Sequence, residues 1–145
     1  MKNKDTKELL NVLKNTTSID ELEEYLDENP LPFESNNLTT YFNQLMQKRR
    51  IEKKDVVKHS QLPRTYAYQI LNGTKNPSRD KLLCLCFALN CTLDEAQKML
   101  TLGHHALLYS KSRRDAILIF AIQKKLSLID VNELLYDFNE KTLYE

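Results

Sequence analysis

Glycine occurs only twice among the 145 residues of this chain, and proline occurs only four times. Tight β-turns depend on these two residues, because glycine tolerates positive φ angles and proline presets the φ angle of a turn. Leucine, lysine, glutamate, aspartate and asparagine dominate the rest of the sequence. The composition therefore predicts an all-α protein and argues against a β-sandwich, a β-barrel or a nucleotide-binding fold with a glycine-rich loop.

Helix start and stop signals divide the chain into short segments. Capping boxes open helices after Ser18 and Thr92, because each hydroxyl accepts a backbone N–H and the glutamate three residues later reciprocates. Pro63 suits the first position of a helix, and Asn72-Gly73 is typical of the residues that end one. With the apolar spacing, these signals predict helices over residues 6–14, 19–28, 38–50, 53–59, 63–71, 79–89, 93–102, 112–125 and 128–139.

The net charge of +1 conceals three differently charged segments. Residues 1–36 carry a net charge of −5, residues 37–92 carry +7 and residues 93–145 carry −1. A basic middle segment is either the solvated surface of ordinary helices or a face that binds a polyanion. The arrangement of residues within the segment has to distinguish these two interpretations.

Several classes of function have no support in the sequence. The odd number and close spacing of Cys84, Cys86 and Cys91 predict buried thiols instead of disulfides or a metal site. His104 and His105 have no acidic or thiol partner at ligand spacing, so we expect no metal there. Because no phosphate-binding loop, zinc-protease motif or nucleophile elbow occurs, we expect neither an enzyme nor a bound cofactor.

The sequence also predicts a cytoplasmic location. Its longest uncharged apolar run covers residues 116–122, whereas about 20 residues are needed to span a bilayer. The first residues are basic, but no apolar stretch of a secretory signal follows them.

Residues 53–89 are expected to form three short helices joined by a three-residue turn and a loop that contains Asn-Gly. Val57 before the turn and Ala67 and Ile70 after it have the spacing at which two steeply crossing helices share a small apolar core. Ala67 is small, as the close crossing of two helices requires. The spacing is that of a helix-turn-helix, and it favours the polyanion-binding interpretation of the basic segment.

Four stretches then follow one another in a pattern that extends over five helices: Leu45–Arg50, Asp55–Gly73, Lys75–Leu83 and Ala88–Glu95. With this pattern, the chain from Tyr41 to Glu95 resembles the Cro/C1-type helix-turn-helix domain of the XRE family. The family usually has glycine in the turn, where this chain has Gln61. Glutamine adopts a positive φ angle only at some cost, so either the turn is redrawn or modest strain is accepted.

The resemblance implies a lambda-repressor-like, all-α fold with a five-helix core. We expect this helix-turn-helix domain to occupy residues 37–102. An acidic helical arm and a linker, residues 1–36, precede it. Two extra helices in residues 103–145 follow it, and they are similar to a helical extension on some bacterial members of the family.

The resemblance further implies that the second helix of the pair, residues 63–71, enters the major groove of duplex DNA. Arg64, Thr65, Gln69 and Tyr66 would then contact bases. Arginine pairs with guanine O6 and N7, glutamine pairs with adenine N6 and N7, and threonine offers a hydroxyl or a methyl group.

Phosphate contacts are expected to outnumber base contacts and to set the register on the duplex. Lys53 and Lys54 lie at the start of the first helix of the pair, where the helix dipole adds partial positive charge. The loop after the second helix supplies Asn72, Thr74 and Lys75. Arg79 lies in the first turn of the following helix, where the family also places a backbone contact.

The resulting hypothesis is a sequence-specific transcriptional regulator that binds double-stranded DNA. By the usual mode of the family, it is a repressor whose operator occupancy blocks polymerase. The alternative is a protein-interaction adaptor or inhibitor that keeps the helix-turn-helix shell. Such an adaptor would bind a protein partner through the acidic arm or through the C-terminal helices.

Two regions keep alternative roles open. The helices predicted from residue 112 onwards have apolar residues on more than one face, which indicates burial. They either pack on their own chain or form the interface of a homodimer, as is common in the family. The acidic arm is a cap on the core, a site for a protein partner, or a segment that competes with DNA for the basic face.

Overall fold

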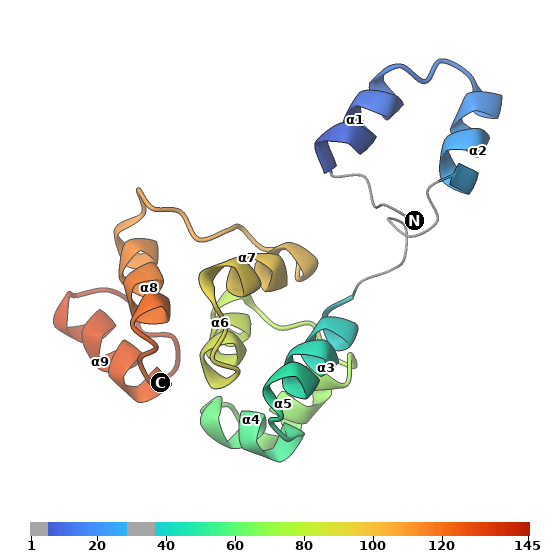
Figure 1. Cartoon of the computed structure of the whole chain (residues 1–145). Coiled ribbons are helices and arrows are strands. Elements are labelled where there is room, and N and C mark those ends of the chain that lie inside the picture. Colours follow the sequence, from blue (N-terminus) through green and yellow to red (C-terminus); the bar gives the residue numbers. More distant parts are fainter. Residues whose placement is uncertain (1–5, 29–36) are drawn as a thin grey trace. The chain divides into compact units, whose positions relative to one another are not determined.

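The computed structural model of the protein describes residues 6–28 and 37–145 (Figure 1). Within these two ranges the secondary structure consists of helices and their connecting loops, which confirms the all-α prediction. The chain divides into two compact units, Met1–Ser35 and Asn36–Glu145. No helix in the described part of the chain is long and apolar enough to cross a membrane.

The helix boundaries lie close to those expected from the sequence. The helices are α1 (Thr6–Lys14), α2 (Ile19–Glu28), α3 (Leu38–Arg49), α4 (Lys53–His59), α5 (Arg64–Leu71), α6 (Arg79–Ala88), α7 (Leu93–Leu102), α8 (Arg113–Gln123) and α9 (Leu128–Asp137). The linker expected before residue 37 lies outside the described residues, and the side chain of Asn37 caps α3.

One boundary prediction was wrong. Pro63 is not the first helical residue of α5 but the residue before it, because its ψ angle of 136° is extended. Its carbonyl still accepts the first helical hydrogen bond, from the Ala67 N–H at 2.9 Å. The missing N–H of Pro63 therefore costs α5 nothing, and the rigid φ angle fixes the direction in which the chain enters the helix.

In the first unit, α1 and α2 contact each other across a short turn. The Ser18 hydroxyl accepts the Glu21 N–H at 3.1 Å, as the capping box predicts. The Glu21 carboxylate, however, accepts the N–H of Thr17 at 2.8 Å, one residue earlier than a capping box requires. Ile19 stays 76% exposed and Leu10 50% exposed, so part of the apolar surface of this unit faces solvent.

In the second unit, the core is organised around α6. All residues from Leu82 to Leu89 are buried, although a helix at the surface of a domain buries only one stripe. α4, α7 and α9 each pack against α6, and Figure 1 shows α6 between α3–α5 and the α8–α9 pair. Each fully buried leucine contributes about 1.5–3 kcal/mol through the hydrophobic effect, so α6 binds the helix-turn-helix and the C-terminal helices into one core.

In this unit α5 ends as the sequence predicts, with Gly73 at a φ angle of +84°, whereas the left-handed residue that ends five other helices is not glycine. Residues with positive φ angles follow α3, α6, α7, α8 and α9, and they are Arg50, Asn90, His104, Lys125 and Asn139. At each end the next N–H donates to a carbonyl in the last helical turn, as from Ile51 to the Met46 carbonyl at 2.9 Å. These residues let a chain with few glycines turn sharply, at a cost of roughly 1–2 kcal/mol for each non-glycine residue in this conformation.

The C-terminal helices pack on their own chain. Leu118, Ala121, Val131 and Leu135 are fully buried between α8, α9 and the rest of the unit. Four large apolar side chains of α8, α9 and the residue after α9 are 48–75% exposed, namely Phe120, Ile129, Tyr136 and Phe138. Packing on the chain therefore accounts for one face of α8 and α9 and leaves a second apolar face at the surface.

The prediction of buried thiols is confirmed. Cys84, Cys86 and Cys91 are all reduced and buried in the core. Burial raises the pKa of the Cys84 thiol to about 12, which keeps it protonated at neutral pH. The sulfurs of Cys86 and Cys91 lie 3.5 and 3.6 Å from that of Met99, so they act as small packing groups between α6 and α7.

Candidate nucleic-acid interface

The turn between α4 and α5 is short and held by hydrogen bonds. Ser60 is fully buried, and its hydroxyl donates to the Val57 carbonyl at 2.8 Å and accepts the Leu62 N–H at 3.3 Å. Gln61 has a φ angle of +60°, the left-handed conformation that glycine adopts more easily. Of the two alternatives left open by the sequence, the chain adopts the left-handed turn and accepts strain at Gln61.

The helix after the turn, α5, is amphipathic: one side is buried and the other side is exposed to solvent. Ala67, Ile70 and Leu71 are buried in α5, which packs against α3 and α4, whereas Arg64 and Thr65 are exposed. Ala67 has no exposed surface, so the missing side-chain bulk is what allows α4 and α5 to cross closely. The polar side of α5 is therefore presented to solvent by a rigid apolar base.

The four residues expected to contact bases divide between different sides of α5. Thr65 and Gln69 are four residues apart and therefore lie on one side of α5, where Thr65 is exposed and Gln69 is partly exposed. The Arg64 guanidinium lies 5.7 Å from the centre of the Tyr68 ring, which limits the directions the arginine can take. Tyr66 is only partly exposed and packs toward α6, where the Lys81 ammonium lies 4.5 Å from its ring centre.

Five of the six expected phosphate-contacting residues lie at the ends of α4 and α5. Lys53 opens α4, and its ammonium donates to the side-chain oxygen of Asn72, the residue that ends α5, at 2.8 Å. Thr74 and Lys75 are exposed, and their N–H groups donate to the Gln69 carbonyl at 2.9 and 3.2 Å. Lys54 is exposed beside Glu52, whose hydrogen bond and charge raise the pKa of the lysine. The start of α4 and the loop after α5 thus carry three lysines, an asparagine and a threonine, of which Lys53 is partly exposed and the others are exposed.

Arg79 differs from the other five. Its guanidinium donates two hydrogen bonds to the Asp115 carboxylate, at 3.1 and 2.9 Å, and further bonds to the Ala106 and Leu107 carbonyls. Four of the five N–H groups of an arginine are therefore used inside the protein. The structure places Arg79 in a contact with the C-terminal helices and not on the exposed face of α4 and α5.

Lys58 is a further basic residue of this face that was not predicted from the sequence. Lys54, Lys58 and Arg64 surround a hollow of about 420 Å³ between α4 and α5, and the Tyr68 ring lines the same hollow. Lys58 lies one helical turn after Lys54, so the spacing of four residues places both ammonium groups on one side of α4. That spacing was the available signal, and it marks Lys58 as a further cation on this face.

Two other basic residues near the site have a structural role. Lys48 and Arg49, at the end of α3, both form ion pairs with Glu95 in the first turn of α7. Burial alone would raise the pKa of Glu95. The hydrogen bonds from Arg49 and the Thr92 N–H, with the charges of Arg49 and Lys48, outweigh burial and lower that pKa to about 2. This pair ties α3 to α7 behind the helix-turn-helix.

Two short helices that cross over an apolar base, with an exposed polar side on the second, define a helix-turn-helix protein. Residues 42–98 match the family model of the Cro/C1-type HTH DNA-binding domain. Residues 42–98 thus form a domain of this family, which confirms the resemblance and supports DNA-binding regulation as the general function. Neither the comparison with curated proteins nor that with solved structures yielded a match.

Proposed function

We propose that the protein is a sequence-specific transcriptional repressor that reads the major groove of duplex DNA with α5. The observation that carries the proposal is the two-sided character of this helix. Its inner side is buried through Ala67, Ile70 and Leu71, and its outer side exposes Arg64 and Thr65. A major groove admits a helix presented in this way.

Base recognition falls to three side chains of α5. Arg64 pairs with guanine O6 and N7, and the Tyr68 ring beneath it lowers the number of orientations lost on binding. Gln69 pairs with adenine, and Thr65 contacts a base or a thymine methyl group beside it. Tyr66 reaches the DNA only at the edge of the interface, because α6 and Lys81 cover part of its ring.

Positioning on the duplex falls to the exposed cations around α5. Lys53, Lys54, Lys58 and Lys75 neutralise phosphates, while Asn72 and Thr74 supply neutral hydrogen bonds. Because Arg79 is engaged inside the protein, it is not part of this set. Four neutralised phosphates per subunit correspond to a slope of about −4 in a plot of log affinity against log salt concentration.

Repression follows if operator occupancy blocks polymerase. A single module rarely contacts enough DNA to be selective, so we propose that two copies bind a two-fold symmetric site. The exposed apolar face of α8 and α9, with Phe120, Ile129, Tyr136 and Phe138, is the surface proposed for the homodimer. We also propose that residues 103–145 act as a dimerisation extension of the helix-turn-helix domain of residues 37–102.

A second candidate function is that of an adaptor for a protein partner. It is favoured by the first unit, where Ile19 and Leu10 are exposed beside the acidic residues of α2. Residues 1–36 carry a net charge of −5. A partner for this arm would present a basic surface with an apolar centre.

Selection of bound sequences from a randomised duplex library distinguishes the two functions. The regulator is expected to enrich a two-fold symmetric sequence whose half-sites are about one helical turn apart. The double variant Thr65→Ala with Gln69→Ala should lose the enrichment but still bind DNA, since its phosphate contacts are intact. Failure of the folded wild type to enrich any sequence would favour the adaptor.

A further inference from the structure

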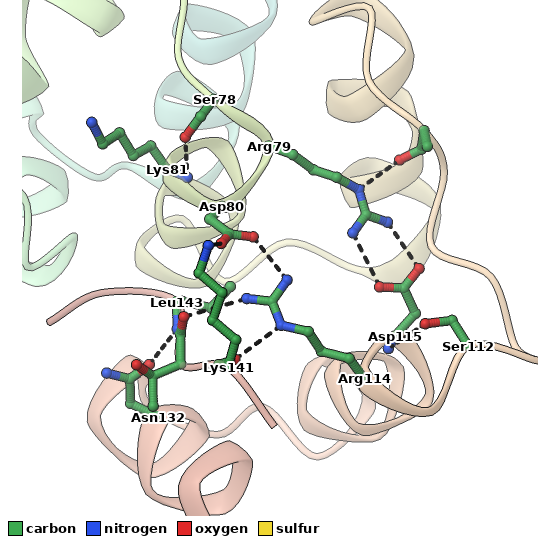
Figure 2. Close-up of polar contacts among 12 residues, drawn as sticks. Ser78, Arg79, Asp80, Lys81, Ser112, Arg114, Asp115, Asn132, Lys141 and Leu143 are labelled. Carbon is green, nitrogen blue, oxygen red and sulfur yellow. Dashed lines mark hydrogen bonds and ion pairs between the residues drawn. The ribbon is translucent and has the colours of Figure 1, made fainter. Parts of the chain in front are cut away.

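The first turns of α6 and α8 are joined by two crossed ion pairs (Figure 2). Each helix begins with a capping serine, Ser78 or Ser112, and each carries an arginine directly followed by an aspartate. Arg79 of α6 pairs with Asp115 of α8 at 2.9 Å, and Arg114 of α8 pairs with Asp80 of α6, also at 2.9 Å. Each helix therefore supplies the arginine of one ion pair and the aspartate of the other.

Backbone contacts reinforce the crossed pairs. Arg79 also holds the exposed segment before α8, through the Ala106 carbonyl at 2.9 Å and the Leu107 carbonyl at 3.1 Å. Arg114 also holds the C-terminal residues, through the Lys141 carbonyl at 2.9 Å. Asp115 is buried and accepts the Tyr109 N–H at 3.0 Å. Residues 103–145 thus form hydrogen bonds and ion pairs with both Arg79 and Asp80 in the first turn of α6.

That first turn lies next to the proposed DNA interface. Lys81, two residues after Arg79 and therefore on a different side of α6, places its ammonium 4.5 Å from the Tyr66 ring of α5. Lys75, an exposed phosphate-contacting candidate, lies only four residues before Arg79 in the loop that leads into α6. Side chains of a helix lean toward its N-terminus, so a released Arg79 side chain would extend toward the phosphates that the loop approaches.

We propose that the C-terminal extension withholds Arg79 from DNA, and that Asp115 is the positioning residue that does so. This inference rests on the proposed DNA-binding function. In the resting protein the Asp115 carboxylate binds the guanidinium in place of a phosphate. Loss of the carboxylate charge, or displacement of the extension, frees one further cation for the duplex. The affinity for DNA is therefore set by residues that do not touch DNA.

The test is a comparison of four full-length variants on a labelled random duplex, with anisotropy measured over a series of salt concentrations. Asp115→Asn should bind about tenfold more tightly near 50 mM salt, and its salt dependence should be steeper by about 0.9. Asp130→Asn removes the same charge from the exposed first turn of α9 and should change affinity less than about twofold. Arg79→Gln alone should leave affinity and slope unchanged, and it should abolish the gain when combined with Asp115→Asn.

Three outcomes overturn the inference. Unchanged affinity and slope in a folded Asp115→Asn protein would show that Arg79 is not withheld. A slope less steep by about 0.9 in Arg79→Gln would show that Arg79 already contacts DNA in the wild type, and this arm decides the matter if Asp115→Asn does not fold. Absence of duplex binding by the wild type contradicts the proposed function itself, and the inference with it.

Discussion

The Lys53 ammonium donates a hydrogen bond of 2.8 Å to the side-chain oxygen of Asn72. The first residue of α4 is thereby tied to the residue at the end of α5, across the helix-turn-helix. Both residues are candidates for phosphate contacts, so the bond holds two parts of one interface at a fixed separation before DNA arrives. Preorganisation of this kind raises affinity by lowering the ordering cost of binding.

Asn72→Ala should separate this ordering effect from charge. The variant keeps Lys53, so binding to a random duplex should weaken about threefold with an unchanged salt slope. Lys53→Ala should also weaken binding, but with a slope less steep by about 0.9. Asn76→Ala changes another exposed asparagine of the same loop and serves as the control. Equal slopes in the Lys53 variant and the wild type would remove Lys53 from the interface.

Ala67→Leu should destabilise the domain. Ala67 is fully buried where α5 packs on the core, and three additional carbon atoms there force neighbouring side chains out of place. The expected loss in the free energy of unfolding is about 1–3 kcal/mol, measured by urea denaturation. Ala116→Leu, at an exposed position of α8, should change stability by no more than about 0.5 kcal/mol. A neutral Ala67→Leu would mean that α5 does not pack as described.

Gln61→Gly should stabilise the protein. The left-handed φ angle of +60° costs a non-glycine residue roughly 1–2 kcal/mol, while glycine loses about 0.5–1 kcal/mol through greater chain entropy in the unfolded state. The net gain is about 0.5–1 kcal/mol, visible as a higher urea midpoint. Gln123→Gly, in the last turn of α8, should instead lower stability by about 1 kcal/mol. A loss of stability in Gln61→Gly would exclude strain at the turn.

The low pKa of Glu95 predicts how stability responds to acid. Because this pKa falls from an ordinary value of 4.5 to about 2 in the folded protein, the Glu95 ion pairs contribute stability above pH 4.5. The contribution is lost as the pH falls from 4.5 through about 2. Glu95→Gln should therefore lower the free energy of unfolding at pH 7 by about 2 kcal/mol and by much less at pH 2.

The control for this experiment is Glu133→Gln, an exposed position of α9. It changes the net charge of the protein in the same way, but it should leave the pH dependence of stability as it is in the wild type. If Glu95→Gln were equally destabilising at pH 2 and at pH 7, the effect would come from packing and not from the ion pairs with Lys48 and Arg49.

Local signals in the sequence predicted most of the fold. Ser78 and Thr92 cap helices as expected, because a hydroxyl at a helix start acts within three residues. The exposed side of α5 followed from the spacing of Ala67 and Ile70. Pro63 was misplaced by one residue, since a proline is equally acceptable before and at the first helical position and the backbone ψ angle decides between them.

The long-range contacts could not be predicted. Arg79 and Asp115 are 36 residues apart, and nothing local distinguishes an arginine that pairs with a distant carboxylate from one that faces solvent. The same holds for Arg49 and Glu95, which meet only because α3 and α7 pack together. Candidate site residues can therefore be predicted where they lie on one helix and its adjoining loop. They cannot be predicted where a side chain forms an ion pair with a helix that is distant in the sequence.

The salt dependence of binding to a random duplex tests the central claim most directly. The full chain is titrated against labelled duplex, and the dissociation constant is measured between about 50 and 200 mM salt. We predict micromolar binding at the low end and a slope of about −4 per bound subunit, because Lys53, Lys54, Lys58 and Lys75 displace counterions from phosphates. Absence of saturable binding by the folded protein, or an affinity that does not change with salt, would contradict the assignment of this face to DNA.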